Sequence, residues 1–237
     1  MIKRLYLILF IAISSICVSY AQKIVRFQDE LSGLYGYKQQ GKVVIQAQFV
    51  NAAKEFSEGL AAVEIGTRDI LKSETYYNWG YIDQTGRVVI PPQFFEARNF
   101  SEGFAAVSTR GEGWKYVNHN NELITIESSV SFLGDFTDGF APFMIKGHLW
   151  GFVNKVGKIV IQPIYRGVYA LEQGFALVKV DSHLGTYVYV NMKGEEISKY
   201  ANDLSEAKRL LKLYKKTNNG KAYLLWYDET VNCNDID

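Results

Sequence analysis

The residue types that could carry catalysis are few in this sequence, and their spacing fits no common catalytic motif. The three histidines, His119, His148 and His183, lack the spacing with which a helix presents two imidazoles to zinc. No Gly-x-Ser-x-Gly or Gly-x-x-x-x-Gly-Lys motif occurs. The run from Asp181 to His183 holds the residue types of a catalytic triad, but three consecutive residues cannot adopt that geometry. The sequence therefore predicts a protein that is not an enzyme, with no cofactor and no metal site.

Three carboxylates recur at one position, directly before a glycine. They are Glu58, Glu102 and Asp138. Two such groups held at a fixed distance could act as a glycosidase-like acid pair. The other interpretation is that short acidic residues favour turns and keep the chain soluble. We favour the second interpretation, because each carboxylate stands inside a turn pattern.

The elements that must position these residues come from an internal repeat. Two linked signatures recur: Trp79-Gly80-Tyr81-Ile82-Asp83 followed by Gly86 and Val88-Val89-Ile90, and then Phe100-Ser101-Glu102-Gly103-Phe104-Ala105-Ala106-Val107. The residue after the aromatic stands at positions 36, 80, 115, 151 and 188, in steps of 44, 35, 36 and 37 residues. The long first step is explained by a polar insertion, Gly66 to Thr75. A fixed period of this length indicates a repeat architecture of about five copies.

The pattern resembles the WG-containing repeat family of bacterial proteins. Trp79 to Val107 matches the family pattern almost throughout, and Gly36 to Val63 and Trp150 to Val178 match well. The copy at Trp114 lacks the glycine and the proline, and the copy at Tyr187 lacks the tryptophan. The resemblance implies a bacterial protein whose repeats supply interaction surfaces instead of catalysis.

Each repeat is expected to fold as about three short strands. Tyr81-Ile82 and Val88 to Ile90 are apolar β-formers separated by a turn that Asp or Asn opens, and a glycine three residues later accepts positive φ. Pro91-Pro92 and Pro163 are expected to stop the second strand. A third strand, Phe104 to Val107, follows. The fold class is therefore all-β, with about five tandem three-stranded hairpin repeats in an open curved array; the alternative is propeller-like closure.

An aromatic residue begins each copy: Tyr35, Trp79, Trp114, Trp150 and Tyr187. We expect these rings to form the core, packed over the adjacent glycine, because one residue type at one structural position is what packing requires. Exposed aromatics that stack on sugars are the alternative interpretation.

The two ends of the chain depart from the repeat. Met1 to Ala21 resembles a cleavable signal peptide, with Lys3 and Arg4 before a short apolar run. That run is too short to span a bilayer, and Ile16 before Cys17 fits a lipoprotein site poorly. Residues 22–200 form the expected repeat domain. Residues 201–237 are expected to form a helix and a strand that cap it, or a helix that docks a partner.

Charge and cysteine content limit the possible partners. After cleavage, 24 Lys plus Arg face 25 Asp plus Glu, and no basic stripe suited to nucleic acid is present. Only Cys233 remains, so the mature chain has no internal disulfide. The sequence contains no second apolar segment long enough to span a membrane. We expect the protein to be exported to the periplasm or the cell exterior, or to associate with the outer membrane.

The loops that lead into each aromatic are variable and charged, which is typical of recognition on a repeat scaffold. We expect these loops to project from one edge and to bind a protein of the envelope or the cell exterior. The alternative is a carbohydrate-binding or carbohydrate-active protein with a glycan ligand. The candidate binding residues are Arg68, Asp69, Lys72, Arg110, Glu112, Lys146, His148, Asp181 and His183, with Glu74 beside them.

Overall fold

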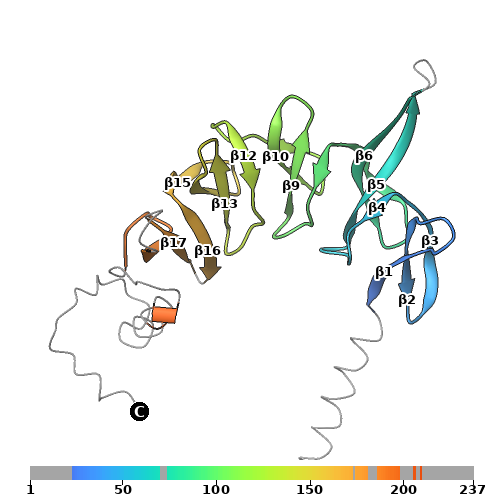
Figure 1. Ribbon diagram of the computed structural model, residues 1–237, viewed down its shortest axis with the longest axis horizontal. Coiled ribbons are helices and arrows are strands. Elements are labelled where there is room, and N and C mark those ends of the chain that lie inside the picture. Colours follow the sequence, from blue (N-terminus) through green and yellow to red (C-terminus); the bar gives the residue numbers. More distant parts are fainter. Residues whose placement is uncertain are drawn as a thin grey trace, which may run out of the picture. The chain divides into compact units, whose positions relative to one another are not determined.

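The computed structural model describes residues 23–69, 74–172, 174–180, 186–197, 205, 206 and 209. The described chain is all-β, with small sheets in tandem (Figure 1). It divides into a first unit, residues 1–112 and 116–123, and a second unit, residues 113–115 and 124–237. The prediction of an all-β tandem of about five small sheets is confirmed.

The first unit contains two complete sheets and most of a third. The first sheet has the order β1-β2-β3, the second β4-β5-β6-β7, and the third β11-β10-β9-β8. Their bounds are β1 Ile24–Gln28, β2 Tyr35–Gln39, β3 Lys42–Phe49, β4 Asn51–Ala52, β5 Leu60–Asp69, β6 Glu74–Asp83, β7 Val88–Phe94, β8 Glu96–Ala97, β9 Phe104–Thr109, β10 Gly113–Asn118 and β11 Leu123–Ile124.

The second unit contains the last two sheets. The fourth sheet has the order β12-β13-β14-β15 and the fifth β16-β17-β18. Their bounds are β12 Val130–Leu133, β13 Phe140–Ile145, β14 Leu149–Asn154, β15 Ile159–Tyr165, β16 Gly167–Glu172, β17 Phe175–Lys179 and β18 Tyr187–Asn191. No helix among the described residues has both the length and the apolar character needed to cross a bilayer.

The sheets do not coincide with the sequence repeats. The third strand of one repeat pairs with the hairpin of the next, as β5 pairs antiparallel with β6 from Leu60 opposite Asp83 to Asp69 opposite Glu74. A short first strand, such as β4, then completes most sheets. The predicted three-stranded unit therefore straddles two sheets of three or four strands. Each repeat contributes strands to two sheets, which links neighbouring sheets through the chain itself.

The expectation that proline stops the second strand is wrong. β7 runs through Pro91 and Pro92, and β15 runs through Pro163. These strands lie at a sheet edge, and their register shifts at the prolines: Trp79 faces Phe94 and Tyr81 faces Ile90, so Gly80 alone faces three residues. Proline is tolerated in an edge strand at such a bulge, because no ladder hydrogen bond is lost there.

The buried aromatic of each repeat is not the one that begins it. The beginning aromatics, Tyr35, Trp79, Trp114, Trp150 and Tyr187, are only partly buried. The residue two positions later is 0–3% exposed in every copy: Tyr37, Tyr81, Tyr116, Phe152 and Tyr189. The beginning aromatics thus flank the core, as Trp79 does.

The buried tyrosines also bond to the chain beyond their own sheet strand. The Tyr37 hydroxyl donates a hydrogen bond to the Ala53 carbonyl (2.9 Å), and the Tyr81 hydroxyl donates one to the Arg98 carbonyl (2.7 Å). Burial raises the pKa of the Tyr37 hydroxyl, which keeps it a donor. Each bond therefore connects a tyrosine of one sheet to the residue that follows the first strand of the next sheet, β4 or β8.

The predicted Asx turns are present. The Asp83 carboxylate accepts hydrogen bonds from the backbone amides of Thr85 and Arg87 (2.9 and 3.1 Å). Asn118, Asn154 and Asn191 make the same two bonds in their own turns. The first copy instead turns over two residues, Gln40 and Gly41, with φ of 51° and 76°.

Both ends of the chain lie largely outside the described residues. The predicted signal peptide, Met1 to Ala21, lies outside the described residues, together with Cys17 within it. Cys233 also lies outside them. Residues 205, 206 and 209 are helical, and the rest of the predicted C-terminal helix and strand is outside the described part.

Candidate binding surface

The charged loops predicted to bind a partner are hairpin loops that join two neighbouring antiparallel strands of a sheet. They join β5 to β6, β9 to β10, β13 to β14 and β17 to β18, and we call these hairpin ends the tips. Because the strands are antiparallel, the Asx turns and the acid–glycine turns lie at the opposite end of each sheet. The predicted residues therefore occupy equivalent places in successive sheets.

Four of the predicted residues can be placed with their side chains. Arg110 and Glu112 are exposed in the β9–β10 tip, and Lys146 and His148 are exposed in the β13–β14 tip. His148 has a φ of 60° and follows Gly147 with a φ of 95°, and its amide donates a hydrogen bond to the Ile145 carbonyl (3.2 Å). A tight turn thus presents both Lys146 and His148.

The other predicted residues lie at the margin of the described chain or beyond it. Arg68 and Asp69 belong to β5, and their backbones pair with Thr75 and Glu74 of β6. Lys72, Asp181 and His183 lie outside the described residues. Within the first unit, the structure therefore places the β5–β6 and β9–β10 tips at the same end of two sheets that share one core.

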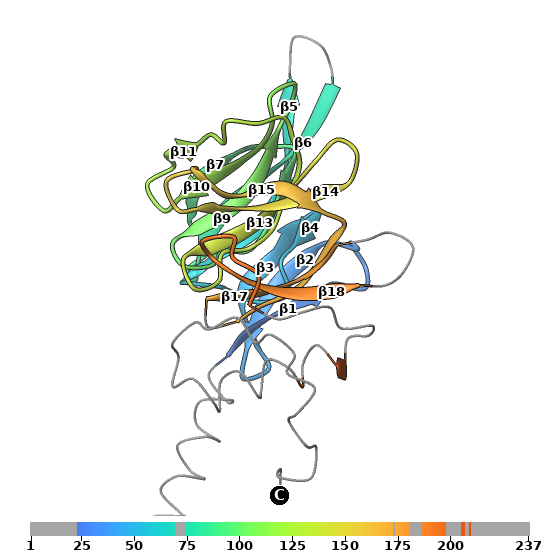
Figure 2. The same cartoon turned by 90° about the vertical axis from the view of Figure 1, so that its left-hand side faces the viewer.

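The insertion from Gly66 to Thr75 lengthens two strands instead of forming only a loop. β5 and β6 have ten residues each, whereas β9 and β10 have six each. β4 pairs with β5 only as far as Glu64, and β7 pairs with β6 only as far as Trp79. The end of the β5–β6 hairpin is consequently a two-stranded ribbon that extends past its own sheet (Figures 1 and 2).

Sequence reasoning missed a second set of residues beside the tips. The residue before the first strand of a sheet (β4, β8 or β16) donates its backbone amide to a carbonyl of the strand that leads to the tip. The three bonds are Val50 to Glu64 (3.0 Å), Phe95 to Ser108 (2.8 Å) and Arg166 to Lys179 (2.7 Å). All three donor residues are exposed, and Phe95 is 53% exposed. The only signal in the sequence was the doubled phenylalanine, Phe94-Phe95, since adjacent strand residues face opposite sides.

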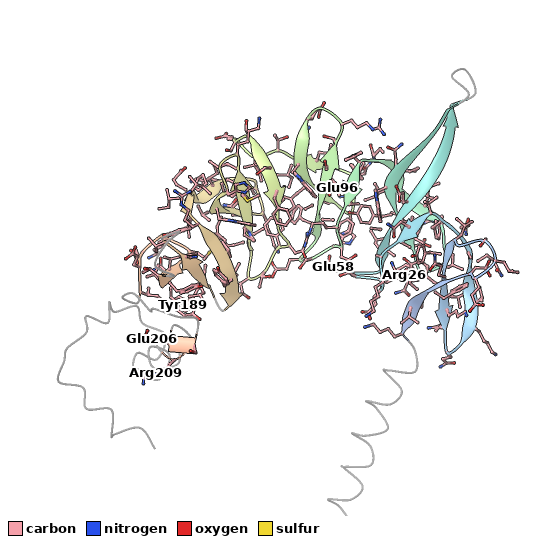
Figure 3. All side chains as sticks on the ribbon, in the orientation of Figure 1. Arg26, Glu58, Glu96, Tyr189, Glu206 and Arg209 are labelled. Atoms are coloured by element: carbon pink, nitrogen blue, oxygen red, sulfur yellow. The ribbon has the colours of Figure 1, made fainter. Side chains whose placement is uncertain are left out.

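The recurring carboxylates hold neighbouring turns together. The Glu58 carboxylate accepts a hydrogen bond from the Gly103 amide (2.9 Å) (Figure 3 labels Glu58), and the Asp138 carboxylate accepts one from the Gly174 amide (3.3 Å). Each residue sits in a two-residue turn with positive φ at the acid and the glycine. These bonds support the turn interpretation over a glycosidase-like pair.

One histidine lies beside these turns. The His119 ring stacks on Phe100, with centroids 4.3 Å apart and planes inclined by 27°. Its Nε2 atom is 3.7 Å from Oε2 of Glu58. The Ser57 hydroxyl donates to the Phe100 carbonyl (2.6 Å) in the same place. These contacts thus connect the turn at Ser57 and Glu58 with Phe100 and with the Asx turn that contains His119.

Partly exposed aromatic rings of the second unit pack edge to face. Phe132 lies 5.9 Å from Trp114 and 5.6 Å from Trp150, with planes inclined by 55° and 65°. Tyr169 and Tyr187 are 5.1 Å apart and inclined by 73°. Inclined pairs of this kind stabilise packing between rings. They do not form the flat row of faces that a sugar-stacking platform uses.

Comparison with known protein families found a match over part of the chain. The WG containing repeat matches the chain at residues 37–66, 79–112 and 150–182. A search of curated proteins returned no match.

The solved structures that the chain matches include three whose sequences are 7–12% identical to it. The crystal structure of HIRA(644-1017) is 7% identical, with a TM-score of 0.41 over 62% of this chain and 51% of that one. A eukaryotic initiation factor is 12% identical, with a TM-score of 0.45 over 72% and 53%. The WD40 beta propeller domain of Doa1 is 11% identical, with a TM-score of 0.34 over 77% and 76%. The chain spans about half the length of the first two.

Proposed function

Because the chain carries WG-containing repeats over three segments, residues 37–66, 79–112 and 150–182, we propose that it is a non-enzymatic scaffold that binds a protein partner through its tips. The partner is a protein of the cell envelope or the cell exterior. The resemblance of Met1 to Ala21 to a signal peptide supports this location. The chain needs no cofactor for this function.

The observation that carries the proposal is that the two ends of the sheets differ in variability. The tip loops contain three residues between β9 and β10, three between β13 and β14, and seven between β17 and β18. The β5–β6 tip is a ribbon with strands of ten residues. At the opposite end, the same Asx turn recurs at Asp83, Asn118, Asn154 and Asn191, and acid–glycine turns with positive φ recur at Glu58, Glu102 and Asp138. Variation at one end of a regular scaffold is how repeat proteins carry recognition.

The charge of the tips favours a protein over a nucleic acid. Arg110 stands two residues from Glu112, and Arg68 stands beside Asp69, so these two tips carry charges of both signs. A nucleic-acid surface requires clustered Lys and Arg without acidic neighbours. Mixed charges suit the polar rim of a protein interface.

The test is affinity capture from solubilised envelope of the producing cells. A tip variant carries Arg68→Glu, Arg110→Glu and Lys146→Glu. A control variant carries the same number of reversals at the opposite end of the sheets: Lys42→Glu, Lys158→Glu and Lys193→Glu. We expect the wild type and the control to capture a specific protein and the tip variant to lose it. Tm should change little, because Arg110, Lys146 and the three control lysines are exposed.

Two results would contradict the proposal. One is capture by the tip variant at the level of the wild type. The other is the absence of any specific protein with the wild type, which would favour the alternative, a carbohydrate-binding protein. A glycan array probed with the wild type would then be the next measurement.

A further inference from the structure

Phe95 is an exposed aromatic ring on a fixed backbone. Its amide donates to the Ser108 carbonyl (2.8 Å), Ala97 pairs with Val107, and the amide of Arg98 donates to Ala106 (2.9 Å), so the backbone around it is bonded to β9 (Glu96, its neighbour in the chain, is labelled in Figure 3). The preceding Phe94 is 1% exposed, whereas Phe95 is 53% exposed. A ring held this way loses little conformational entropy when it is covered by a partner.

The exposure of Phe95 is unusual in this molecule. The other large apolar side chains exposed in the described part of the chain are valines, leucines and isoleucines, with a single tyrosine, Tyr169. Exposed valines are ordinary at the edge of a sheet, where β-branched residues are favoured for the strand itself. An exposed phenylalanine gives no such advantage at a loop-to-strand junction. Aromatic residues, phenylalanine included, are by contrast enriched at protein–protein interfaces.

Arg110 of the β9–β10 tip lies over this ring. Its guanidinium carbon is 5.7 Å from the centroid of Phe95, within the range of a cation–π interaction. The guanidinium group is planar and carries five N–H donors, which suit the two oxygens of a carboxylate. Glu96, the residue after Phe95, is exposed and would repel further acidic groups. The pair therefore offers an apolar surface next to a single cation.

We infer that Phe95 and Arg110 form the anchor of a binding site for a peptide segment of a partner protein, in which an apolar side chain stands next to one carboxylate. The apolar side chain packs on the free part of the Phe95 ring, and the carboxylate accepts hydrogen bonds from Arg110. The exposed Glu96 beside Phe95 selects against runs of acidic residues. This inference rests on the proposed function and names the anchor of its tip surface.

The test uses random peptides displayed on phage and selected on the immobilised full chain. We expect enriched peptides to contain Leu, Ile or Phe next to a single Asp or Glu. Synthetic copies of these peptides, labelled with a fluorophore, are then titrated with wild type, Phe95→Ala, Arg110→Gln and a control, Val89→Ala. Val89 is also an exposed apolar residue, 36% exposed, but lies on β7.

Fluorescence polarisation should show Kd at least about tenfold higher for Phe95→Ala and unchanged for Val89→Ala. Arg110→Gln should weaken the acidic peptide but not its Asn or Gln analogue. The inference is overturned if no peptide is enriched, if enriched peptides lack the carboxylate, or if Phe95→Ala binds as the wild type does. If the tip variant nevertheless fails to capture the envelope protein, the proposed function stands and only the anchor is wrong.

Discussion

At Gly80 the structure has no room for a side chain. A Cβ atom placed there would lie 2.6 Å from the Ile90 carbonyl oxygen and 2.8 Å from the Pro92 nitrogen. Gly36 and Gly151 face the equivalent carbonyls of Ile45 and Ile161 at 2.6 and 2.5 Å. The glycine of the repeat therefore admits the bulged edge strand of its own sheet.

The two copies without this glycine support the explanation. Lys115 and Val188 stand at the equivalent positions. Lys115 lies on β10, whose neighbour on the edge side is only the two-residue β11. Val188 lies on β18, which has no further strand beside it among the described residues. The presence of glycine thus correlates with a long bulged edge strand.

We predict that Gly80→Ala lowers the free energy of unfolding by about 1–3 kcal/mol, the usual cost of forcing a methyl group into a packed site. Urea denaturation followed by tryptophan fluorescence measures it. Lys115→Ala, at the same position of the repeat, is the control and should cost clearly less. An equal loss of stability in both variants would show that the bulge does not explain the glycine.

Sequence periodicity could identify the repeated aromatics but not their burial. Trp79 and Tyr81 both lie on the same strand, and alternation alone places them on the same face. The bulge at Gly80 shifts the register between them, so Tyr81 pairs with Ile90 and Trp79 pairs with Phe94, and only Tyr81 of the two is fully buried. A register shift depends on the partner strand, which the local sequence does not contain.

At the scale of elements, the turns were easier to predict than the strand pairing. Asx residues and glycines determine turns locally, and the expected side-chain bonds of Asp83, Asn118, Asn154 and Asn191 are present. Pairing between strands is set by contacts distant in sequence. The short first strands, such as β4 and β8 with two residues each, have no pattern long enough to indicate a strand.

The carboxylate bonds between turns predict a measurable contribution to stability. Glu58→Ala should lower the free energy of unfolding by roughly 0.5–1 kcal/mol, since a partly exposed hydrogen bond to the Gly103 amide is lost. Alanine and glutamate tolerate the positive φ at this position about equally poorly, so the backbone contributes little. Glu58→Gln keeps an acceptor and should cost less. Chemical denaturation that gives the same stability for all three proteins would rule out this role.

At the scale of the whole molecule, the regular sheets and the variable tips divide the chain into scaffold and surface. The candidate residues Arg110, Glu112, Lys146 and His148 could be chosen from the sequence because they interrupt the repeat. Phe95 could not, because its exposure depends on the connection that crosses to the tip end of the next sheet. The proposed binding surface could thus be located from the repeat, whereas its proposed apolar anchor could be located only from the fold.

The central claim is that the partner covers the tips. The most direct measurement is amide hydrogen exchange over the full chain, alone and saturated with the captured partner. The account predicts slower exchange at residues 66–69, 74–77 and 109–113 on binding, and unchanged exchange at the Asx turns, residues 83–87 and 118–122. Protection of the Asx turns with no change at the tips would contradict it.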